Sequence, residues 1–191
     1  MANEDIIRTI TGKETEVISE VDNSLSRLAR MDEEELCKIK GIGHSTAQKL
    51  MCAFELGKRL FEEKHTYTHL CSSVAIYQHL RPKMAYQNKE CGYVVLMGQN
   101  FNVIDTIKLS EGGMTETAID VREILRLALV NRATIIAIAH NHPSNNVEPS
   151  KNDDILTRQV AKACETMRIF FMDHLIIGDD SFYSYHDKGK L

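Results

Sequence analysis

The sequence of 191 residues lacks the features of a membrane or secreted protein. No window approaches the roughly 20 consecutive apolar residues that a membrane-spanning helix needs. The first residues, MANEDIIRTITGKETE, are acidic and polar, without the basic and apolar regions of a secretion signal. We therefore expect a globular cytoplasmic protein that has no membrane partner.

Cysteine is also scarce, and its spacing excludes two kinds of site. The five cysteines are an odd number, and no two of them form a C-x-x-C pair. This spacing argues against a disulfide framework and against a zinc site made of thiolates. We expect reduced and mostly buried thiols at Cys37, Cys52, Cys71, Cys91 and Cys164.

The formal net charge of −4 does not indicate a nucleic-acid-binding protein, but one short segment is basic. Residues 36–60 contain five bases and a single acid, and a Gly-Ile-Gly turn lies between two predicted helices. Backbone N–H groups at such a turn can bind a phosphate. The segment predicts weak contacts to the DNA backbone through Gly41, Gly43, Lys38, Lys40 and Lys49, while a plain packing role remains the alternative.

Only residues after about 70 alternate between the periods of strands and helices. The apolar run ATIIAIA at 133–139 is typical of a strand buried on both faces, so it should lie centrally in a sheet. We predict a helical domain over residues 1–64, a linker, and an α/β domain with a mixed sheet over 70–191. Its predicted elements are helices at 72–80, 121–131 and 155–167, and strands at 93–97, 101–107, 133–139, 169–172, 174–177 and 182–185.

The residues with the clearest chemistry directly follow this central strand, in the string HNHPSNNVEPSKND. His140 and His142 are two apart on an extended backbone, so their imidazoles point the same way. Together with Asp153 they form a ligand set of nitrogen and oxygen atoms that suits zinc and leaves a fourth position open. The string therefore predicts a catalytic zinc site.

The same residues have a structural alternative. Ser150 could cap a helix whose first turn contains Asp153, and the spacing alone does not decide between a cap and a metal ligand. The position favours the metal, because sites of α/β proteins gather at the carboxyl ends of strands. Pro143 and Pro149 also stiffen the connecting loop.

The string resembles the JAMM signature, H-x-H-x7-S-x-x-D, as found in the RadC family of bacterial JAB/MPN-type proteins. DHLIIGD at 173–179, and KIKGIG with AFELGKRL near the N-terminus, extend the resemblance over residues 30–191. The resemblance implies a JAB1/MPN-type (cytidine-deaminase-like) sandwich that follows a helix-hairpin-helix domain. It also implies one Zn2+ per chain, held by His140, His142 and Asp153. Asn145 stands where the family has glycine, and asparagine tolerates the positive φ that such a turn needs.

The resemblance also implies a general base, a glutamate just before the first core strand. Glu90 has that position, and Glu123 on a later helix is the competing candidate. Ser150 is then expected to donate a hydrogen bond to the developing oxyanion. His174 could support a ligand or simply be a packed histidine.

Two functions from different classes follow from these features. The first is a zinc metallopeptidase that hydrolyses a peptide or isopeptide bond in a peptide or protein substrate. The second is a catalytically silent protein associated with DNA repair, in which the fold serves as a scaffold. A zinc nucleoside deaminase is excluded, because H-x-E followed by P-C-x-x-C does not occur.

Overall fold

The computed structural model describes residues 2–12, 21–22, 24–64, 68–112 and 119–191. The chain divides into two compact units, Met1–Lys64 and His65–Leu191. Across the described ranges, every helix is too short or too polar to span a lipid bilayer.

The smaller unit consists of helices around one apolar core, which includes Leu28, Leu36, Ile42 and Leu50. Helix α3 begins at a capping box, in which the backbone N–H of Asp32 donates to the Glu35 side chain and the backbone N–H of Glu35 donates to the Asp32 side chain. The turn after α3 requires one glycine, because Gly41 has φ of 90° while Gly43 does not have a positive φ. The helices are α1 (Asn3–Thr11), α2 (Leu25–Arg30), α3 (Glu33–Cys37) and α4 (His44–Lys64).

The larger unit contains a five-stranded mixed sheet, which confirms the predicted α/β class. The strand order is β2-β1-β3-β4-β5, and only the β3–β4 pair is parallel. Every residue of the central strand is buried, as its apolar run predicted. The strands are β1 (Cys91–Met97), β2 (Val103–Glu111), β3 (Ile135–Asn141), β4 (Phe170–Ile177) and β5 (Phe182–Ser184).

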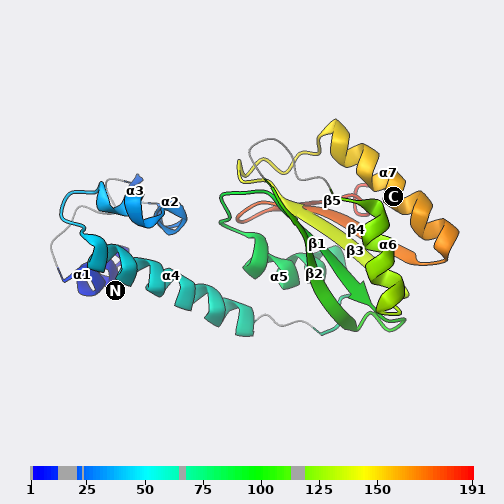
Figure 1. Ribbon diagram of the computed structural model, residues 1–191, viewed down its shortest axis with the longest axis horizontal. Helices are drawn as coiled ribbons and strands as arrows, with labels where there is room; N and C mark the ends of the chain where they lie inside the picture. The colour runs from blue at the N-terminus through cyan, green and yellow to red at the C-terminus, as the bar shows by residue number, and fades with distance from the viewer. Residues whose placement is uncertain (1, 13–20, 23, 65–67, 113–118) are drawn as a thin grey trace. The chain divides into compact units, whose positions relative to one another are not determined.

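Helices cover both faces of this sheet (Figure 1). Helix α5 (Ser73–Met84) packs on one face, against residues such as Val95 and Ala137. Helices α6 (Val121–Val130) and α7 (Lys151–Met167) pack on the other face, against Val94 and Ile138. Because side chains alternate along a strand, His140 shares the face of Ile138 and points to the side of α7.

Several element boundaries differ from the prediction: for example, α7 begins at Lys151 rather than at residue 155, and β2 spans Val103–Glu111 rather than 101–107. Helix α5 continues through Pro82 to Met84, where we predicted an end at residue 80. Both residues are buried, Met84 in the core against the sheet, and a proline near the last turn removes only one backbone hydrogen bond. The two short strands predicted around residue 173 form one strand, β4, whose pairing with β3 shifts by one residue between Phe171 and Asp173.

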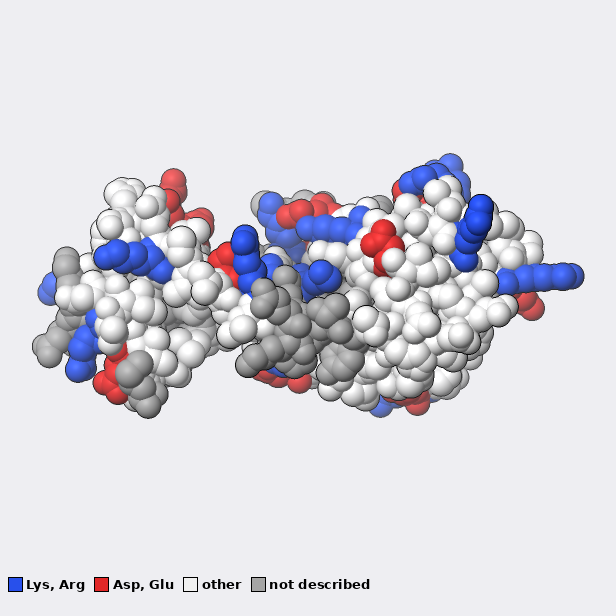
Figure 2. Space-filling model, turned by 90° about the horizontal axis from the view of Figure 1, so that it is seen from below, with Lys and Arg blue, Asp and Glu red and all other residues white. Residues whose placement is uncertain are grey.

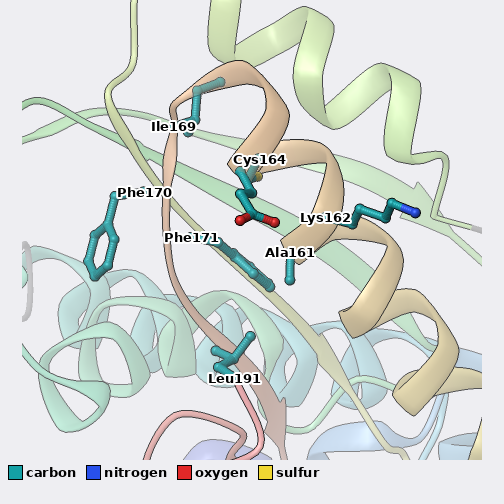
Figure 3. Close-up of a pocket in the computed structure, with 8 residues that line it drawn as sticks. Ala161, Lys162, Cys164, Ile169, Phe170, Phe171 and Leu191 are labelled. Carbon is teal, nitrogen blue, oxygen red and sulfur yellow. The ribbon is translucent and has the colours of Figure 1, made fainter.

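In the described part of the chain, an apolar groove of about 610 Å³ lies at the start of β4. Figure 3 shows residues from three segments at its border: Phe171 of β4, Ala161 of α7 and Leu191 at the C-terminus. None of the predicted site residues lines this groove; Ser150 and Asp153 lie at the opposite end of α7.

Candidate metal centre

The end of β3 and the residues after it place two imidazoles on one face of the sheet. His140 pairs with Gly92 of β1 and with Ile176 of β4, so its backbone is held on both sides. His142 follows the strand, and its N–H still donates to the carbonyl of Ile177, 3.0 Å away. The two side chains therefore project in the same direction, as the spacing predicted.

The start of α7 brings a carboxylate to these imidazoles. Ser150 is the N-cap, and its Oγ accepts from the N–H of Asp153 at 3.2 Å. Both the N–H and the hydroxyl of Ser150 donate to Asp153 Oδ2 at 2.7 Å. Capping and metal binding are therefore compatible, because the capping box holds the Asp153 carboxylate beside the two histidines.

The three predicted ligands lie together in the structure. His140 Nε2 is 3.1 Å from His142 Nε2 and 3.1 Å from Asp153 Oδ1, and His142 Nε2 is 3.8 Å from Asp153 Oδ2. In the described part of the chain, this is the one group of three or more His, Cys, Asp or Glu residues whose ligand atoms lie within 4.8 Å of one another. The structure thus contains a possible metal site of two histidines and one aspartate.

The protonation of these groups fits a cation. The carbonyl of Asn146 lies 2.6 Å from His142 Nδ1 and can only accept, so Nδ1 carries the proton of the neutral ring and Nε2 presents a lone pair. Burial alone raises the pKa of Asp153, but the hydrogen bond and charge of His140, with the hydrogen bonds from Ser150, lower it well below its usual value. A lone pair and an ionised carboxylate therefore face the same point, where a metal ion would stabilise them.

The loop after His142 is anchored to the β4–β5 turn. Asn145 has φ of 61°, the left-handed conformation predicted for this position. Its N–H donates to the His142 carbonyl at 2.9 Å, and its Oδ1 accepts from the N–H of Asp179 at 2.8 Å. A glycine would permit the same backbone, but it would lack the second contact.

Glu90 lies just before β1 and is partly buried. Gly92 pairs with His140 in the antiparallel β1–β3 ladder, so Glu90 lies two residues before the position that pairs with a predicted ligand. Asn141 holds this segment: its Oδ1 accepts from the N–H of Cys91 at 2.7 Å, and its Nδ2 donates to the carbonyl of Lys89 at 3.1 Å. Asn141 lies between the two histidines of the motif, and nothing in the sequence signals this role.

The competing glutamate has a different environment. Glu123, in the first turn of α6, accepts two hydrogen bonds from Arg126, at 2.7 and 2.6 Å. The hydrogen bond from Arg126 lowers the pKa of Glu123. A general base near neutral pH needs the opposite shift, so this environment does not suit Glu123 to that role.

His174 of β4 is fully buried, and its Nε2 lies 3.0 Å from His140 Nδ1. Burial, and then the neighbouring charge of His140, lower the pKa of His174 well below its usual value, so the ring is neutral. It therefore contacts a predicted ligand directly, which is one of the two possibilities that the sequence left open. Thr157 of α7, which the sequence did not single out, contacts His174 in turn.

The five residues predicted to contact DNA belong to the smaller unit. Lys38 and Lys40 lie in the connection between α3 and α4, Lys49 lies in α4, and all three are exposed, as are Gly41 and Gly43. On the face that Figure 2 displays, Lys and Arg side chains are interspersed with Asp and Glu rather than gathered in one large basic surface.

Comparison with known proteins agrees with this fold. Residues 70–190 match the family model described as RadC-like JAB domain. The chain belongs to this family. It is 38% identical over 179 residues to a UPF0758 protein of Porphyromonas gingivalis, covering 92% of this chain and 79% of that protein. A UPF0758 protein of Streptococcus gordonii is 32% identical over 193 residues, covering 97% and 85%. These names state no reaction, so the RadC-like relatives show family and fold rather than activity.

Proposed function

We propose that this RadC-like protein is a zinc-dependent hydrolase that cleaves an amide or isopeptide bond. The observation that carries the proposal is the convergence of His140, His142 and Asp153 at the end of the buried strand β3. Two imidazole nitrogens and one carboxylate oxygen are ligands that suit zinc and leave a coordination position for water or substrate. The His142 and Asp153 side chains are 15% and 13% exposed, so the site opens to solvent.

The chemistry then divides between the ion and the protein. A bound zinc supplies Lewis acidity, which polarises the scissile carbonyl and lowers the pKa of water from about 15.7 toward about 7. Glu90 accepts the proton of the attacking water and delivers it to the leaving amine. Ser150, whose hydroxyl donates to Asp153 in the structure, turns to donate to the oxyanion as negative charge develops there.

Metal analysis tests the ligand assignment. After purification without chelators, we expect about one zinc ion per chain, since a catalytic site of this ligand set holds a single ion. His140→Ala and His142→Ala should lose it. His186→Ala is a matched control, because that side chain is 65% exposed and remote in sequence from the site. Absence of zinc from the wild type would refute the proposal, and zinc retained in both ligand variants would refute the assignment.

A pair of glutamate variants tests the general base. Glu90→Gln should keep zinc and lose hydrolysis of peptide or isopeptide libraries by about 10²–10⁴-fold, the range for general acid–base catalysis. Glu123→Gln should retain activity, because its carboxylate pairs with Arg126 on the surface of α6. The opposite result would transfer the role to Glu123. No hydrolysis by a zinc-loaded wild type would favour the scaffold alternative.

A second candidate function is DNA association, in support of which we note the exposed turn before α4 and the lysines around it. Fluorescence anisotropy with a DNA duplex should show binding that weakens steeply between about 50 and 200 mM salt, because phosphate contacts release counterions. Lys38→Glu and Lys40→Glu should reduce binding more than Lys58→Glu, a matched charge change farther along α4. Binding that is absent at low salt, or insensitive to salt, would refute it.

A further inference from the structure

Two buried polar residues outside the metal-site motif connect its ligands. His174 of β4 is 0% exposed and Thr157 of α7 is 1% exposed. His174 Nε2 lies 3.0 Å from His140 Nδ1, and His174 Nδ1 lies 2.7 Å from Thr157 Oγ1. Thr157 Oγ1 in turn lies 2.6 Å from the backbone carbonyl of Asp153. The four groups form a continuous path from one predicted ligand to the residue that supplies another.

The direction of every hydrogen bond along this path follows from its last member. A carbonyl oxygen only accepts, so the Thr157 hydroxyl must donate its single proton to Asp153. Thr157 Oγ1 can then only accept from His174, so Nδ1 of His174 carries the ring proton. The unprotonated Nε2 of His174 must accept from His140, so the proton of neutral His140 lies on Nδ1.

The ring of His174 is also held in this orientation. It stacks on Tyr185, with ring centroids 5.0 Å apart and planes 5° apart. The Tyr185 hydroxyl donates to Asp154 at 2.8 Å, next to the ligand Asp153. A flipped His174 ring would place Cδ2 and Cε1 where Nδ1 and Nε2 now lie and would lose both contacts, so the hydrogen bonds select this orientation of the stacked ring.

We infer that Thr157 and His174 are positioning residues that select the tautomer of His140 in which Nε2 presents its lone pair to the metal centre. The Asp153 carboxylate, 3.1 Å from Nε2, favours a proton there, which would block coordination. The path through His174 opposes this by requiring a proton on Nδ1. The Asn146 carbonyl selects the same tautomer of His142 directly. The buried path therefore has the same effect on His140 as the loop carbonyl has on His142.

The inference rests on the proposed metal centre, but its first test needs no metal. Long-range proton–nitrogen NMR of histidine-labelled, metal-free protein distinguishes the two tautomers of each ring. For the neutral rings, we expect the Nδ1–H tautomer in both His140 and His174. An Nε2–H tautomer of His174 in the wild type would overturn the inference, whether or not the protein binds zinc.

Variants of one threonine give the second test. Thr157→Val keeps the shape of the side chain but removes the hydroxyl, so zinc affinity should fall by about 10–100-fold, as for other residues that orient metal ligands. Thr157→Ser should restore most of the affinity. Thr166→Val is a matched control, because the Thr166 hydroxyl makes the same kind of bond on α7, to the carbonyl of Lys162 at 2.9 Å, away from the site.

The outcomes separate this inference from the proposed function. If the wild type does not bind zinc, the proposed function is contradicted. The histidine tautomers measured by NMR then test the hydrogen-bond path by themselves. If the wild type binds zinc and Thr157→Val binds it as tightly as Thr166→Val, the positioning role is refuted. Circular dichroism of each variant checks folding, and an affinity loss in folded Thr157→Val that Thr157→Ser restores supports the role.

Discussion

Replacing Asn141 should loosen the segment that carries Glu90 without removing a metal ligand. Asn141 is 3% exposed, and its side-chain amide bonds to both Cys91 and Lys89. These bonds continue the contact between the two segments beyond the last paired residues, Gly92 and His140. Asn141→Ala removes both of these bonds and a third, which the Cys91 thiol donates to Asn141 Oδ1 at 3.0 Å, while it keeps the strand backbone intact.

The expected cost follows from what each partner loses. Cys91 is buried, so its N–H loses an acceptor that water does not readily replace, at a cost of about 1–3 kcal/mol. Lys89 is exposed, so water can satisfy its carbonyl at little cost. We therefore expect the free energy of unfolding to fall by about 1–3 kcal/mol. Amide exchange at residues 89–91 should accelerate as well.

Tyrosine fluorescence in a urea titration measures the free energy of unfolding of the larger structural unit. The chain has no tryptophan, and all six tyrosines lie within residues 65–191, so the signal reports on the larger unit alone. Asn131→Ala is the control, because Asn131 is partly exposed and caps α6 through one side-chain bond, to the carbonyl of Leu127. Equal destabilisation by the two variants, or unchanged exchange at 89–91, would refute the reasoning.

Three further predictions use the same unfolding assay or simple reagents. Chelating zinc should destabilise the larger unit, by about 2.7 kcal/mol if the wild type was measured at 100 times the dissociation constant, and His142→Ala should show no such effect. A thiol reagent should modify the exposed Cys52 and Cys71 quickly but Cys91 and Cys164 only on unfolding, because the latter two are buried and burial raises the pKa of Cys164 to about 11; equal rates would contradict the structure. Burial also raises the pKa of Asp173, despite the hydrogen bonds that its carboxyl group accepts. Protonated Asp173 therefore stabilises the folded state fully below its unfolded pKa of about 3.9, and this contribution is lost as pH rises through its folded pKa. The stability of wild type relative to Asp173→Asn should therefore decline as pH rises above about 4, and a rising difference would contradict this sign.

The central part of the fold was predictable from the sequence because its signals are local and strong. The apolar run at 133–139 could only be a buried strand, and β3 is buried along its whole length. Boundaries set by tertiary contacts were less predictable. Helix α5 continues to Met84, which is buried in the core against the sheet, and β4 runs through Asp173, whose carboxyl group is buried and accepts hydrogen bonds from Ser184 and His186.

The ligands of the site were visible in the sequence, whereas the residues that support them were not. His140 and His142 are two residues apart in an extended segment, so their side chains point in the same direction. Thr157 lies on α7 and contacts His174, which lies on the neighbouring strand β4 and contacts His140. These contacts depend on tertiary packing, so no residue spacing in the sequence predicts them. Asn141 was hidden for another reason, since its role depends on the pairing of β1 with β3.

The ambiguity of S-x-x-D between a helix cap and a ligand has a physical origin. A capping box requires a carboxylate three residues after the N-cap, turned back toward the first residue of the helix. A metal ligand at the same position must turn back toward the preceding strand, which is the same direction. Asp153 does both: its carboxylate accepts from Ser150 and lies 3.1 Å from His140 Nε2. Because the cap orients the carboxylate before any ion arrives, removing the Ser150 hydroxyl should weaken metal binding as well as any catalytic role of that residue.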